Sequence, residues 1–182
     1  MLANRKSSGF LQVGHDEGMT ETGVGLMALL RRLDDPQWLE WPQGYNCGEA
    51  AVSFERLLSV LDADFQTRCT AERTGDSSEY GRIHVPAEAT ECGTRIVVQV
   101  SKFQPLAMVS ADNPGAFFGT AHAQQEGELD AGDLAAVEQA LTGAGYVVVP
   151  EELLEQRYDG PAHLIWNGTH HATWWDRYFG SF

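Results

Sequence analysis

The chain has no lysine or arginine between Lys102 and Arg157. The protein has 182 residues and a net charge of −14. The stretch without basic residues nevertheless contains nine acidic ones, namely Asp112, Glu126, Glu128, Asp130, Asp133, Glu138, Glu151, Glu152 and Glu155. A field of one sign speeds encounters with basic partners and repels nucleic acids and anionic membranes.

The chain is also poor in cysteine and has no long apolar run. Cys47, Cys69 and Cys92 are widely spaced and form no CxxC pair, which predicts reduced thiols in a cytoplasmic compartment and no disulfide framework. No apolar segment approaches the roughly 18 residues of a membrane span. The N-terminal residues lack the apolar core of a secretory signal.

Recognisable catalytic and cofactor motifs are missing as well. The sequence contains no P-loop, no GxSxG and no HExxH. Residues 23–28 formally match the dinucleotide fingerprint GxGxxA, but the polar residues before them cannot form the buried strand that this fingerprint requires. We therefore predict no cofactor.

The patterning that is present predicts a flexible arm over 1–18, without apolar periodicity, and a single globular α+β domain over 19–182. Leucines at helical spacing follow Thr22, and a second apolar stripe follows Asn46, a predicted helix cap. A later helix is predicted to begin at Asp130 and a short one at Pro150. Apolar strand patterns occur at 65–71, 80–85, 96–100, 106–109 and 146–149.

This order of elements predicts an α+β fold. We expect an antiparallel or mixed sheet of four to five strands, with two N-terminal helices and one later helix packed on one face.

The C-terminal stretch is rich in aromatic residues and histidine. It is predicted to act as a clasp that buries its rings against the domain, or as an interface presenting Trp174 and Trp175. A metal site is disfavoured, because the adjacent His170 and His171 would point to opposite faces of a strand. Such a site would draw on these residues: His163, His170, His171, Asp159 and Asp176.

The acidic segment has three interpretations, and its candidate binding residues are Glu126, Glu128, Asp130 and Asp133. Calcium binding is disfavoured because the DxDxDG spacing is missing, so no metal is predicted. A solvated face and a docking surface for a basic protein both stay open. The absence of interspersed cations favours docking more than it would on an ordinary surface.

These observations favour a small acidic cytoplasmic binding protein of the inhibitor or immunity type. Its expected partner is a basic protein, such as a toxin or a nucleic-acid-processing enzyme, with no direct contact to nucleic acid or membrane. The alternative is a hydrolase-type enzyme that combines Cys47 with His84 or His122, or that uses the C-terminal histidines and aspartates. A structural subunit with Trp38, Trp41 and the aromatic tail as contacts is the third hypothesis.

Overall fold

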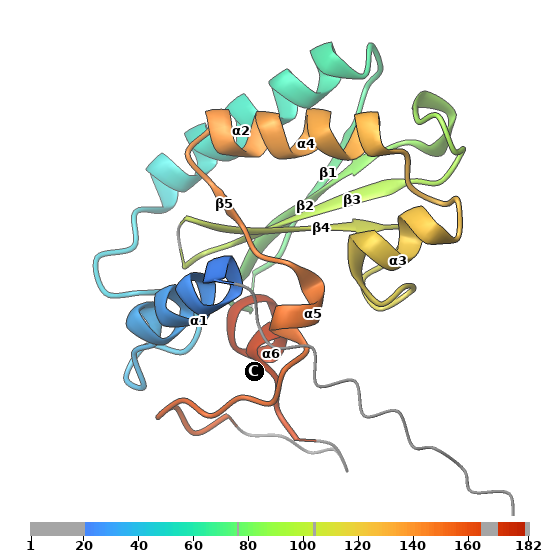
Figure 1. Ribbon diagram of the computed structural model, residues 1–182. Helices are drawn as coiled ribbons and strands as arrows, with labels where there is room; N and C mark the ends of the chain where they lie inside the picture. The colour runs from blue at the N-terminus through green and yellow to red at the C-terminus, as the bar shows by residue number, and fades with distance from the viewer. Residues whose placement is uncertain (1–20, 76, 104, 165–170, 181–182) are drawn as a thin grey trace, which may run out of the picture.

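The computed structural model describes residues 21–75, 77–103, 105–164 and 171–180 (Figure 1). The arm predicted over 1–18 lies outside the described residues, as does His170. The helices are α1 (Glu21–Leu33), α2 (Cys47–Asp64), α3 (Gly119–Gln125), α4 (Ala131–Gly143), α5 (Glu151–Leu154) and α6 (Trp174–Phe179), with a 3-10 turn at Ala87–Ala89. The strands are β1 (Thr70–Arg73), β2 (Glu79–Val85), β3 (Ile96–Ser101), β4 (Leu106–Ala111) and β5 (Val147–Val148).

The five strands form one mixed sheet in the order β1-β2-β3-β4-β5. The first four strands run antiparallel to their neighbours, whereas β5 pairs parallel to β4. A parallel partner requires a long crossover, which α3 and α4 provide. The predicted α+β class with a mixed sheet is therefore confirmed.

Helices cover both faces of this sheet, where the sequence had led us to expect one (Figure 1). Along β4, Ala107 and Val109 belong to a core cluster with α2 and α4, while Leu106 and Met108 belong to a second cluster with α1, α5 and α6. Successive strand residues point to opposite faces, so a strand buried on both sides is apolar throughout and shows no clear alternation. Among the described residues, no helix is long and apolar enough to cross a membrane.

The predicted helix caps at Asn46 and Asp130 are confirmed, whereas Thr22, also expected to be a cap, lies within α1. The side chain of Asn46 accepts hydrogen bonds from the backbone N–H groups of Gly48 and Glu49 at the start of α2. The side chain of Asp130 does the same for Gly132 and Asp133 at the start of α4. Both caps satisfy amides that have no partner within the helix.

The first predicted strand is displaced. Residues 65–68 were expected to begin it, but α2 continues to Asp64 and the chain turns at Gln66, which has a positive φ of 48°. The strand β1 starts only at Thr70. The residues after Asp62 belong to the end of α2 and to the turn that follows it. Alternation of apolar and polar residues over so few positions does not distinguish a helix end from a strand.

Two helices were missed in the sequence. The short α3 begins at Gly119, whose φ of +82° only glycine adopts without strain. The helix α6 begins with a capping box, in which Thr173 and Asp176 exchange side-chain and backbone hydrogen bonds. Its sequence signature, Thr173 followed three residues later by an acidic side chain, was readable in advance.

The aromatic tail is a clasp, as predicted. Trp174, Tyr178 and Phe179 are fully buried in the second core cluster. Ring contacts hold them there, with Trp174 edge-on to Tyr158 and Phe103 edge-on to Tyr178. The C-terminal helix is thus part of the core.

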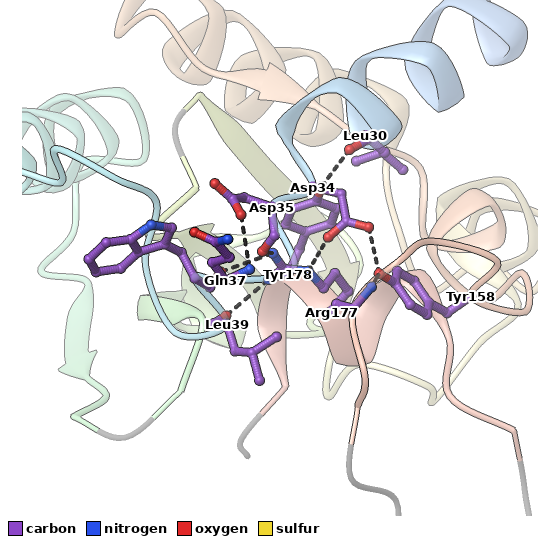
Figure 2. A network of polar contacts seen from close by, with 10 residues as sticks. Leu30, Asp34, Asp35, Gln37, Leu39, Tyr158, Arg177 and Tyr178 are labelled. Atoms are coloured by element: carbon purple, nitrogen blue, oxygen red, sulfur yellow. Dashed lines mark hydrogen bonds and ion pairs between the residues drawn. The ribbon is translucent and has the colours of Figure 1, made fainter.

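A fully buried ion pair ties this tail to the segment after α1 (Figure 2). Nε of Arg177 donates to Oδ1 of Asp34 at 2.6 Å, and its other nitrogens donate to the carbonyls of Asp35, Trp38 and Leu39. The hydroxyl of Tyr158 donates to the second oxygen of Asp34 at 2.5 Å. The charges of both partners are therefore compensated by several hydrogen bonds, the condition under which a buried pair is tolerated.

We predict that Arg177→Met lowers the free energy of unfolding by about 3–5 kcal/mol, because it leaves Asp34 buried and without its cation. The matched control is Arg31→Met, which breaks the exposed pair with Asp159 and is expected to cost at most about 1 kcal/mol. Urea unfolding followed by tryptophan fluorescence measures both. Equal losses in the two variants would contradict this role of Arg177.

Candidate binding surface

The topology gathers acidic residues from separate parts of the chain at one end of the sheet. The β2–β3 connection (86–95) lies at this end, and the antiparallel pairing of Ile96 with Ala111 places the segment after β4 beside it. The chain then passes through α3 into the start of α4 at the same end (Figure 1). Carboxylates that are distant in sequence therefore share one surface.

Two of the four predicted acidic residues, Asp130 and Asp133, form hydrogen bonds that stabilise the fold at this surface. Asp130 caps α4, and Oδ2 of Asp133 accepts a hydrogen bond from the backbone N–H of Glu91 at 2.8 Å. Both remain half-buried. Their charges contribute to the field, but Asp130 also stabilises the start of α4, and Asp133 holds the β2–β3 connection against this helix.

The other two predicted acidic residues, Glu128 and Glu126, differ in how far their side chains are exposed to solvent. The hydroxyl of Thr94 donates to Oε2 of Glu128, which is half-buried. Glu126 is exposed, with Nε2 of His122 at 3.7 Å from its carboxylate. Glu126 is thus the predicted binding residue whose side chain is most available to a partner.

The structure adds Glu91 to this group, a residue that the sequence interpretation missed because it precedes the acidic stretch. Desolvation, followed by the field of nearby carboxylates, raises the pKa of the Cys92 thiol. These carboxylates are Asp130, Asp133, Glu128 and Glu91. A thiol with a raised pKa stays protonated at neutral pH and is a poor nucleophile.

A pocket lies next to the predicted acidic residues, and Glu128 forms part of its lining. This pocket of about 770 Å³, between the β2–β3 connection and the segment after β4, is also lined by Glu88, Asp112 and Phe117, among others. Its basic residue, Arg95, donates to Asp112 at 2.6 Å and is neutralised by it. The pocket thus keeps an acidic rim.

Phe117 also lines a neighbouring pocket of about 390 Å³ between residues 115–119 and α5. Phe118 forms part of its wall and is 84% exposed, the largest exposed fraction among the large apolar side chains described. Opposite the rings lie three carboxylates, Glu151, Glu152 and Glu155. The two pockets share Phe117 in their linings, so their acidic residues lie on neighbouring parts of the surface, next to the exposed ring of Phe118.

Glu151 is the buried member of this group, with only 4% of its surface exposed. Burial raises the pKa of its carboxyl, a hydrogen bond from the Gly115 N–H lowers it, and the charges of Glu155 and Glu152 raise it further. Burial also raises the pKa of Glu155, with a smaller contribution from Asp176. Both residues belong to the acidic stretch seen in the sequence, but their shared pocket depends on the contact between α3 and α5.

The tryptophans proposed as binding residues lie elsewhere. Trp174 is fully buried between Tyr158 and Tyr178, which removes it from any partner surface. Trp175 is half-buried and packs against the same core cluster. Trp174 and Trp175 are successive residues of α6, so their indoles point in different directions. Both nevertheless pack in the second core cluster and belong to the clasp.

The structure does not bring Cys47 and His84 of the enzyme hypothesis together. Cys47 begins α2, which packs on the face of the sheet formed by Ile83 and Val85, whereas His84 alternates onto the opposite face. Cys69 is buried, and burial followed by the influence of Asp62 raises the pKa of its thiol to about 12. Among the described residues, no group of three or more histidine, cysteine, aspartate or glutamate side chains could hold a metal ion.

The raised pKa of Glu151 has a consequence for stability. The native state binds this proton more tightly than the unfolded state, so stability attributable to Glu151 is lost as pH rises through the folded-state pKa. We predict that Glu151→Gln, whose amide cannot ionise, gains stability relative to the native protein between pH 4 and 7. Urea unfolding across this range measures the difference. Glu138→Gln, an exposed site on α4, serves as the control, and parallel pH dependence in both variants would contradict the assignment.

Comparison with known proteins yields no relative. No protein-family model matches the chain, no curated protein matches it, and no solved structure matches it. The residues and their geometry are therefore the basis for a functional proposal.

Proposed function

We propose that the protein is a small acidic binding protein of the inhibitor or immunity type, which neutralises a basic partner protein. The observation that carries the proposal is a pair of neighbouring pockets with acidic linings, one of which includes the exposed ring of Phe118. Acidic rims with an aromatic centre suit a protein interface, since charge steers the encounter and buried rings supply affinity.

The nature of the partner follows from the sign of the field. A net charge of −14, with no basic residue between Lys102 and Arg157, repels nucleic acid and anionic lipid. A toxin or nucleic-acid-processing enzyme carries a basic surface where phosphates bind, and carboxylates can cover that surface. A cytoplasmic location is part of the proposal, because the three cysteines are unpaired.

The test is a double charge reversal at two exposed positions, Glu91→Lys with Glu126→Lys. A partner captured from cell extract by the immobilised native protein is expected to associate at least about tenfold more slowly with this variant at 50 mM salt. Raising the salt to 500 mM is expected to slow the native pair strongly and the variant little, since exposed charges are screened beyond roughly 8 Å already at physiological salt.

The matched control is Asp64→Lys with Glu72→Lys, which changes the net charge equally. Asp64 lies beside the C-terminal end of α4, and the length of this helix, about 20 Å, separates that end from Asp130. Glu72 lies on the edge strand β1. If the control slows association as much as the test pair, the acidic surface is not the binding site. An inhibitor is further expected to abolish its partner's activity at one equivalent.

A further inference from the structure

The pocket between residues 115–119 and α5 has a chemistry that the acidic field alone does not explain. Its carboxylates form no ion pair within the described part of the chain. The only hydrogen bond that the described residues offer to the buried carboxyl of Glu151 comes from the N–H of Gly115, at 2.6 Å. The second carboxylate oxygen of Glu151 accepts no hydrogen bond from the described residues and can accept one from a ligand in the pocket.

The pocket is also held open by glycine. The carboxylate of Glu152 occupies the space that a Cβ at position 119 would need, with Oε1 at 1.9 Å from that point. A side chain at residue 119 would therefore displace Glu152 from the wall of the pocket. The carboxylate of Glu151 is held differently, by the hydrogen bond from the backbone N–H of Gly115.

The aromatic wall is fixed as well. The backbone N–H of Phe118 donates to Nδ1 of His122 at 3.3 Å, and the ring centroids of Phe118 and His122 are 5.6 Å apart. The contact with His122 places the ring of Phe118 in the lining of the pocket, although the ring is exposed to solvent. An aromatic face beside carboxylates is favourable for a cation.

We propose that this pocket accepts the guanidinium group of an arginine side chain presented by the basic partner, with Glu151 as the buried counter-ion and the Phe118 ring as the stacking surface. A guanidinium fits better than an ammonium, because it is planar, stacks on rings, loses water more readily and pairs with carboxylates through two hydrogen bonds. This inference rests on the proposed function, since it names the group by which the partner is anchored.

The test uses N-acetyl-arginine amide as the probe, titrated into the full-length protein and followed by the amide NMR signals of Gly115, Phe118 and Gly119. We expect saturable shifts at these amides, weaker binding of N-acetyl-lysine amide, and no binding of the neutral isostere N-acetyl-citrulline amide. Citrulline binding as tight as arginine, or shifts spread over the whole acidic surface, would overturn the proposal.

Two variants probe the two halves of the pocket. Glu151→Gln and Phe118→Ala are each expected to weaken arginine binding by about fivefold or more. The matched controls Glu72→Gln and Val52→Ala alter an exposed carboxylate and an exposed apolar side chain elsewhere, and are expected to bind as the native protein does. Phe118 is so exposed that its removal leaves the core intact, and unchanged arginine binding in that variant would count against the pocket.

The outcomes separate this inference from the proposed function. Partner association that depends on Glu91 and Glu126 without any arginine binding would refute the pocket and retain the acidic interface. Arginine binding in the pocket with a partner that ignores the charge reversal would refute the acidic interface and retain the pocket.

Discussion

The buried pair between Arg177 and Asp34 is the interaction on which the arrangement of the second face depends. Its two partners come from opposite ends of the described chain, and the guanidinium also binds three carbonyls of the segment between α1 and α2. The stacking of Arg177 on Phe103, with 4.3 Å between the guanidinium carbon and the ring centroid, links the network to the sheet. Gly160 leaves room for the carboxylate of Asp34, since a Cβ at this position would lie 2.1 Å from Oδ2 of Asp34.

This network determines what the C-terminal aromatic residues can do. With Arg177 held by Asp34, α6 must lie against β2 and β3, and Tyr178 donates its hydroxyl proton to the carbonyl of Leu30 in α1. The tail therefore closes one core, and the binding surface that we propose lies where α3, α4 and the β2–β3 connection meet. The aromatic tail thus contributes to the stability of the core, whereas carboxylates line the two acidic pockets.

The acidic surface combines two opposing requirements. Asp130 and Asp133 stabilise the protein, because they satisfy backbone donors at the start of α4 and in the β2–β3 connection. Glu151 has the opposite effect, because burial beside Glu152 and Glu155 disfavours its charge. A carboxyl group whose charge is disfavoured in the free protein gains most from a cation supplied by a partner, which is the physical basis of the arginine site that we propose.

The sequence by itself determined the local features: the caps at Asn46 and Asp130, the apolar strands, the α+β class and the one-sided charge. These follow from short-range hydrogen bonds and from periodicity, which neighbouring residues control. Only the tertiary structure decided that helices cover both faces, that Trp174 belongs to the core, that Asp34 pairs with Arg177, and that Glu151 shares a pocket with Phe118. Such contacts join residues far apart in the chain, and their energies depend on burial and distance, neither of which a linear pattern contains.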